Sequence, residues 1–120
     1  MKEIFEKANG LGKIVLTEEE LQAAKFSEGK KILAIISSTC FYCKATLDSW
    51  HDSEKLKSYL SDNDISLLFI EKWQSPELVR ARGSGEYPNI SGYKNGDCVG
   101  RLVTLIYAED FINSIKDWYK

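Results

Sequence analysis

The chain has 120 residues, of which 43% are hydrophobic and 12% aromatic, and its 16 basic and 18 acidic side chains give a net charge of −2. This length and composition fit one globular domain over residues 1–120 and exclude a disordered chain. The charges are mixed along the sequence without a basic patch, so we expect no nucleic-acid partner.

The sequence also bears on membranes and export. No uninterrupted apolar run approaches the roughly 18 residues that a membrane span needs, so we expect no membrane partner. Residues 1–12 are rich in charged side chains, unlike the apolar core of a signal peptide. We therefore expect a cytoplasmic protein, or a secreted or membrane-associated one if an export signal has been removed.

The first elements alternate between helix and strand. Residues 1–9 predict a short amphipathic helix that is ended by Asn9-Gly10 and Gly12, and residues 13–16 predict a short strand. Thr17 then begins a second helix, because Glu20 stands three residues later and completes a capping box.

The stretch from Lys30 to Trp50 organises the rest of the chain. Residues Ile32 to Ile36 are five consecutive apolar residues, which predict a fully buried strand. A helix is predicted from Phe41 to about Leu60, with Thr39 as its N-cap and a kink in the polar segment 48–53.

Two cysteines, Cys40 and Cys43, fall in the first turn of this predicted helix. The unpaired amides and the dipole at a helix N-terminus stabilise a thiolate relative to a thiol. The second sulfur of a C-x-x-C pair lies one turn away, within reach of a disulfide. We therefore interpret Cys40, nearer the exposed turn, as the attacking thiolate and Cys43 as the resolving partner. The alternative is a structural or incidental pair.

The chain has a third cysteine, Cys98, and three cysteines cannot all be paired, which argues against a disulfide scaffold. Zinc is an alternative, but a tetrahedral site needs four ligands, and only Cys98 and the single His51 could complete one. His51 lies among acidic residues and is expected to be a solvated surface side chain. We expect no metal site, and we interpret Cys98 as an ordinary strand residue, with a regulatory third thiol as the alternative.

A second buried strand is predicted over Ile65–Ile70, which completes a β-α-β unit with a parallel pair of strands. Ser75-Pro76 predicts the start of another helix, since proline is tolerated at the first helical position, and Gly83-Ser84-Gly85 predicts its end.

The last elements are a hairpin and a helix. Asn89–Tyr93 and Cys98–Val103 are strand-like runs that flank the turn residues Asn95-Gly96, the strongest short hairpin signal. Apolar residues from Phe111 to Tyr119 recur at helical spacing and predict a final helix.

This order of elements resembles the thioredoxin family from about Leu16 to Trp118. The resemblance is carried by Cys40-Phe41-Tyr42-Cys43, by Tyr87-Pro88 with its proline 45 residues further on, and by Tyr93-Lys94-Asn95-Gly96-Asp97, which is close to the family's Phe-Lys-Asn-Gly-Glu hairpin. It implies an α/β thioredoxin fold, with a central mixed sheet of four to five strands flanked by helices. It also implies that Pro88 is cis and faces the cysteines, and that the backbone of Tyr87 pairs with an extended substrate.

The chain departs from the family pattern at three places. Thioredoxins carry Trp-Cys-Gly-Pro-Cys, whereas Phe41 and Tyr42 separate the cysteines here, and a tyrosine before the second cysteine is similar to glutaredoxins. The buried aspartate that thioredoxins place six residues before the first cysteine is Ala34. A glycine usual after the last strand is replaced near Thr104.

The resemblance implies a thiol–disulfide oxidoreductase without a cofactor, in which Phe41, Tyr42, Tyr87 and Pro88 bind a disulfide-containing protein or peptide. It further implies an unidentified electron donor or acceptor, and we expect a monomer. Phe41 has an alternative interpretation, in which it packs under a neighbouring loop. Two other functions stay open: a redox-inert thioredoxin-like module that binds peptides, and an accessory oxidoreductase for an exported, bacteriocin-type peptide.

Overall fold

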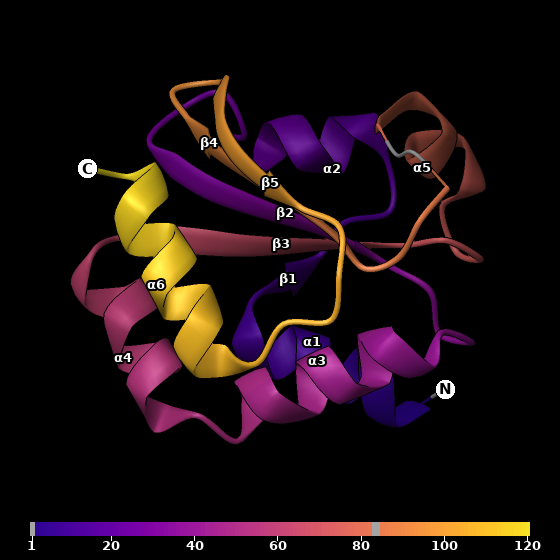
Figure 1. Ribbon diagram of the computed structural model, residues 1–120. Helices are drawn as coiled ribbons and strands as arrows, with labels where there is room; N and C mark the ends of the chain where they lie inside the picture. The colour runs from indigo at the N-terminus through magenta and orange to yellow at the C-terminus, as the bar shows by residue number, and fades with distance from the viewer. Residues whose placement is uncertain (1, 83–84) are drawn as a thin grey trace.

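The computed structural model describes residues 2–82 and 85–120. Six helices and five strands follow one another along this part of the chain (Figure 1). The helices are α1 (Lys2–Leu11), α2 (Glu18–Ala23), α3 (Phe41–His51), α4 (Glu54–Asp62), α5 (Pro76–Arg82) and α6 (Ala108–Trp118). The strands are β1 (Lys13–Ile14), β2 (Lys30–Ile36), β3 (Ile65–Glu71), β4 (Asn89–Lys94) and β5 (Asp97–Leu102).

The strands form one mixed sheet in the order β1-β3-β2-β4-β5. Strand β3 lies between β1 and β2 and is parallel to both, as the predicted β-α-β unit requires. Strand β4 pairs antiparallel with β2, and the hairpin that Asn95-Gly96 predicted adds β5 at the edge. The predicted fold class, an α/β sheet of four to five strands flanked by helices, is confirmed.

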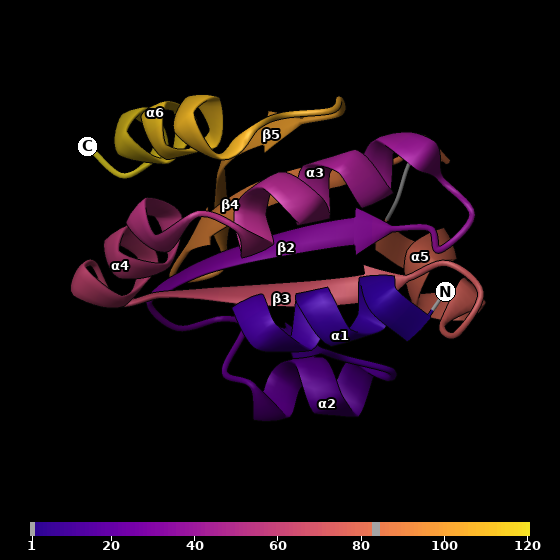
Figure 2. The ribbon, with the colours of Figure 1, turned by 90° about the horizontal axis from the view of Figure 1, so that it is seen from below.

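The two central strands are buried on both faces, and their side chains alternate between two cores. Ile32 and Ala34 of β2 contribute to the core beneath α1, α3, α4 and α6, whereas Leu33 and Ile35 contribute to the core beneath α2 and α5. Figures 1 and 2 show α1 and α3 on one side of the sheet and α2 and α5 on the other. This burial explains the unbroken apolar run in the sequence.

The helix predicted over residues 41–60 is in fact two helices, α3 and α4. Helix α3 ends at His51, and Ser53 then caps α4 by accepting a hydrogen bond from the Leu56 amide at 3.1 Å. A serine that bonds the backbone in this way favours a new helix start over continuation through a kink.

Two smaller predictions need correction. Helix α1 continues past Asn9-Gly10 to Leu11 and ends only before Gly12, the other predicted end, where a Cβ would lie 1.9 Å from the Leu67 carbonyl oxygen of β3. Strand β1 stops at Ile14, although the Val15 amide still donates to β3 at 2.9 Å. Residues 83–84 of the predicted end of α5, Gly83-Ser84-Gly85, lie outside the described residues.

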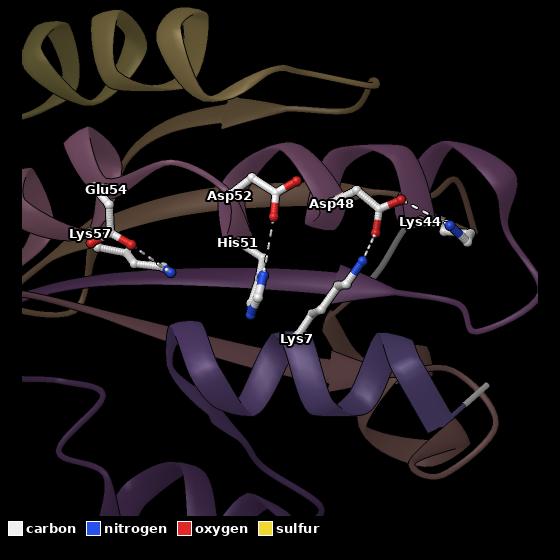
Figure 3. A network of polar contacts seen from close by, with 7 residues as sticks. All are labelled: Lys7, Lys44, Asp48, His51, Asp52, Glu54 and Lys57. Carbon is white, nitrogen blue, oxygen red and sulfur yellow. Dashed lines mark hydrogen bonds and ion pairs between the residues drawn. The ribbon is translucent and has the colours of Figure 1, made fainter.

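An ion pair between Lys7 and Asp48 joins α1 to the side of α3 that faces it (Figure 3). Asp48 of α3 accepts hydrogen bonds from Lys7 of α1 and, at 2.9 Å, from Lys44 one turn earlier in α3. These two cations hold the pKa of Asp48 below its ordinary value. His51 faces Asp52 at 3.4 Å on the surface, in keeping with the solvated position predicted for it.

Within the described part of the chain, none of the helices is both long and apolar enough to span a membrane. Helix α6 instead packs its apolar side against the sheet. Its Phe111 ring stacks on Trp50 of α3 at 4.1 Å between centroids, and Trp118 lies over the glycines Gly92 and Gly100 of the hairpin.

The close approach of Trp118 to Gly100 gives a stability prediction. A Cβ added at Gly100 would lie 2.1 Å from the Trp118 indole nitrogen, so we expect Gly100→Ala to lower the free energy of unfolding by about 1–3 kcal/mol. Urea unfolding followed by tryptophan fluorescence measures this loss. In the Trp118→Ala background, Gly100→Ala should lower the free energy of unfolding by less than half as much. An equal loss in both backgrounds would contradict a clash between the added Cβ and the Trp118 ring.

Candidate functional site

Three segments meet at the end of the sheet where the parallel strands β2 and β3 finish. The register pairs Ile36, the last residue of β2, with Glu71, the last residue of β3. On the other side Ile35 pairs with Asn89, the first residue of β4. The loop into α3, the loop after β3 and the segment before β4 are therefore neighbours, and the cysteines lie among them.

Cys40 itself is the N-cap of α3, whereas the sequence predicted Thr39. The Cys43 amide donates a hydrogen bond to the Cys40 sulfur at 3.2 Å, so the sulfur fills the acceptor place that a serine or threonine oxygen usually takes. Thr39 bonds outside the helix instead: its hydroxyl lies 3.0 Å from that of Ser37 and accepts from the indole of Trp73 at 3.2 Å. The N-cap therefore lies one residue later than predicted.

The two cysteines of the pair differ sharply in exposure. Cys40 is partly exposed, and its thiol lies 3.6 Å from the Tyr87 carbonyl oxygen. Cys43 is fully buried at 0% exposure in the core beneath α3. This burial, above all, raises the pKa of the Cys43 thiol, and a hydrogen bond to the Cys40 sulfur adds to the effect. A substrate from solvent can therefore reach Cys40 first.

The two residues between the cysteines form an exposed aromatic edge. Phe41 is 75% exposed and Tyr42 is 57% exposed, and their rings meet edge to face with centroids 6.1 Å apart. The alternative in which Phe41 packs under a neighbouring loop is therefore wrong. Large exposed aromatic side chains next to a binding site are common anchors for a partner.

Tyr87 lies beside the cysteine turn, since its carbonyl oxygen is 3.6 Å from the Cys40 sulfur, and Pro88 follows it. The peptide bond between them is cis, Pro88 is buried, and Tyr87 is partly buried. Tyr87 borders two grooves. One, of about 560 Å³, is also lined by Tyr42, Val103 and neighbouring residues of the last loop. The other, of about 360 Å³, runs along α5.

Sequence reasoning missed Trp73, which extends the aromatic edge from the loop after β3. Trp73 is 59% exposed, and its indole bond to Thr39 ties it to the cysteine turn. The ammonium group of Lys72 lies 4.5 Å from the centroid of the Trp73 ring and 5.6 Å from that of Tyr87. A tryptophan two residues after the strand that pairs with β2 was the available signal, because the carboxyl ends of parallel strands share one edge of the sheet. We call Phe41, Tyr42, Trp73 and Tyr87 the aromatic rim.

Sequence reasoning also missed Glu71, which it left outside the strand. Glu71 is 1% exposed and is the last residue of β3. Its carboxylate accepts hydrogen bonds from the amides of Ser38, Trp73 and Gln74 at 2.8–2.9 Å. A glutamate that directly follows an apolar strand could have been recognised as a candidate at this edge.

Cys98 and His51 lie away from the pair. His51 is at the far end of α3, and Cys98 is exposed at the hairpin, near the opposite end of β2. Within the residues that the structure describes, no three histidine, cysteine or acidic side chains gather as a set of metal ligands. The four ligands that zinc would need are therefore not brought together by Cys40, Cys43, Cys98 and His51.

Comparison with solved structures identifies the architecture. The chain superposes on a mutant thioredoxin from Halobacterium salinarum with a TM-score of 0.73 and 14% identity over 92% of this chain and 93% of that one. It matches Plasmodium falciparum thioredoxin with a TM-score of 0.72 and 18% identity, covering 90% and 99% of the two chains. Oxidised mitochondrial thioredoxin 3 from Saccharomyces cerevisiae gives a TM-score of 0.70 and 15% identity over 92% and 98%. No family model matches the sequence, and no curated protein matches it either.

The fold is therefore that of the thioredoxins, as the resemblance predicted. Within that fold Cys40 and Cys43 sit close together in a C-x-x-C arrangement at the start of α3. At 14–18% identity these structural matches describe the architecture alone.

The burial of Cys43 predicts how the stability of the reduced protein depends on pH. A thiol whose pKa is raised in the folded state keeps its proton there, whereas the unfolded chain loses it near the ordinary value of 9.0. The unfolded state then binds fewer protons, so stability is retained below that pH and falls as the pH rises above it. Denaturant unfolding of the reduced protein at pH 8 and pH 10 measures the loss.

Cys43→Ala is the control, because it removes this ionisation, and its loss of core packing does not depend on pH. We expect the drop in stability between pH 8 and pH 10 to be smaller in Cys43→Ala than in the wild type. Equal drops in the two proteins would show that Cys43 ionises equally well in both states.

Proposed function

We propose that the protein is a thiol–disulfide oxidoreductase in which Cys40 attacks and Cys43 resolves. The observation that carries this proposal is that a partly exposed sulfur and a fully buried one lie in the first turn of the same helix. The Cys43 amide nitrogen lies 3.2 Å from the Cys40 sulfur. The amides there favour negative charge on the Cys40 sulfur. The buried Cys43 keeps its proton until the first step is complete.

The reaction has two exchanges. The Cys40 thiolate attacks one sulfur of a substrate disulfide, the substrate S–S bond breaks, and the departing substrate thiolate takes a proton. Cys43 then loses its proton and attacks the Cys40 sulfur of the mixed disulfide. The second substrate thiol leaves and the Cys40–Cys43 disulfide forms, so the substrate has gained two electrons and two protons. A dithiol donor restores the reduced pair, and the reverse sequence would oxidise a substrate instead.

The aromatic rim supports a protein or peptide substrate. Phe41, Tyr42 and Trp73 are each more than half exposed around the attacking sulfur. The backbone of Tyr87, with Pro88 after it, is the edge along which we propose that an extended segment lies. The aromatic surface alone would equally suit the redox-inert peptide-binding module, so turnover must separate the two functions.

Turnover of a peptide disulfide tests the proposal. With dithiothreitol as donor, the wild type should accelerate reduction of an insulin disulfide, and Cys40→Ser should show no rate above the uncatalysed reaction. Cys43→Ser should instead accumulate a mixed disulfide with the substrate, visible by mass spectrometry, because the resolving sulfur is missing.

Cys98→Ser is the matched control and should keep the wild-type rate, because Cys98 is exposed at the other end of the sheet. A wild type that binds the peptide as tightly as Cys40→Ser and never reduces it would favour the redox-inert module.

The role of the rim is tested by comparing substrates. We expect Phe41→Ser to lower kcat/KM for a peptide disulfide by about tenfold, the loss typical of one exposed anchor of about 1.4 kcal/mol. The same variant should reduce a small disulfide such as hydroxyethyl disulfide at the wild-type rate. Tyr107→Ser, which removes a 56% exposed aromatic ring on the segment before α6, is the control and should change neither value. Equal losses on both substrates would contradict a docking role.

A further inference from the structure

Glu71 is a buried charge that the proposed exchange reactions do not use. Only 1% of its surface is exposed, at the end of β3 beside the cysteine turn. Burying a carboxylate costs several kcal/mol unless hydrogen bonds compensate it. Here the compensation comes from backbone amides, three of which donate to the two carboxylate oxygens. Such charge-assisted bonds are about twice as strong as neutral ones.

The three amides belong to two different loops. Oε2 accepts from Ser38, two residues before Cys40, at 2.8 Å. Oε1 accepts from both Trp73 and Gln74 at 2.9 Å. The carboxylate therefore fastens the turn that carries the attacking sulfur to the loop that carries part of the aromatic rim. The indole bond from Trp73 to Thr39 is a second tie between the same loops.

The side chain also lies on the face of the sheet that holds the resolving cysteine. Phe69, two residues earlier in β3, contacts the core that contains Cys43, and alternation along the strand places Glu71 on the same face. The charges that act on Cys43 come from Cys40 at the start of its own helix and from Glu71 on β3, and the Cys43 thiol in turn acts on Tyr87 before β4. The negative charge of Glu71 opposes ionisation of Cys43.

We propose that Glu71 is the positioning residue of the dithiol site, which fixes the cysteine turn against the Trp73 loop and holds a carboxylate behind the sulfur pair. This inference rests on the proposed redox function of the pair. Negative charge at this place opposes loss of the Cys43 proton, which must precede the attack of Cys43 on the mixed disulfide. Removing the charge should therefore let Cys43 ionise at a lower pH.

Glu71→Gln tests the charge. We expect Glu71→Gln to lower the pH at which Cys43 ionises, followed by thiolate absorbance, by about half to one unit. The ionised fraction of Cys43 at a given lower pH should then rise roughly three- to tenfold. Disulfide exchange by the pair is measured separately in a glutathione buffer, in which two glutathione thiols reduce the Cys40–Cys43 disulfide and become glutathione disulfide.

Glu19→Gln is the matched control, because it removes the same charge from an exposed position on α2. Glu71→Asp keeps the charge and should restore the ionisation of Cys43 towards the wild type. If Glu71→Gln leaves the ionised fraction of Cys43 within twofold of wild type and lowers only the stability, the proposal is wrong.

A measurement on the wild type covers the case in which Glu71→Gln does not fold. Amide hydrogen exchange should show Ser38, Trp73 and Gln74 protected in both the reduced and the oxidised protein, since all three donate to one buried carboxylate. Exchange at the rate of open loops would overturn the positioning role. A wild type that never forms the disulfide in glutathione would overturn the proposed function instead, and the exchange data would still decide the position of Glu71.

Discussion

The hydrogen bond from the Cys43 amide to the Cys40 sulfur, at 3.2 Å, is the contact on which the rest of the site depends. It makes a sulfur atom the N-cap of α3, and thereby places that sulfur against the free amides of a helix N-terminus. The same turn of helix carries the second sulfur into the core. One short element thus gives the two thiols opposite environments, one open to solvent and one closed to it.

The proposed reaction requires that this arrangement have a rigid support, because a loop that moved freely would carry the Cys40 sulfur away from a bound substrate. The support comes from strand ends. Ile36 and Glu71 finish side by side, and the carboxylate of Glu71 binds the amides of both following loops. A buried carboxylate that is satisfied by backbone donors is costly to move, since any displacement leaves a charge without partners. The fold therefore holds the reactive turn through main-chain contacts.

Charge and exposed aromatic surface distinguish this site within the thioredoxin fold. Ala34 stands where the resemblance to thioredoxins would place a buried aspartate, and Glu71 on the neighbouring strand supplies a buried carboxylate instead. Phe41, Tyr42 and Trp73 surround the exposed sulfur with aromatic rings. This exposed aromatic surface is the feature on which our proposal of a protein or peptide substrate rests.

The sequence by itself determined the order of the elements, the buried central strands, the hairpin and the position of the C-x-x-C pair, because periodicity and turn residues are local signals. It misplaced the N-cap and merged α3 with α4, since several neighbouring polar residues could cap a helix and only the packed backbone selects Cys40 and Ser53. Only the tertiary structure showed that Glu71 and Trp73 belong to the candidate site. Their partners in the cysteine turn lie far away along the chain, and only the register of β2 with β3 brings them together.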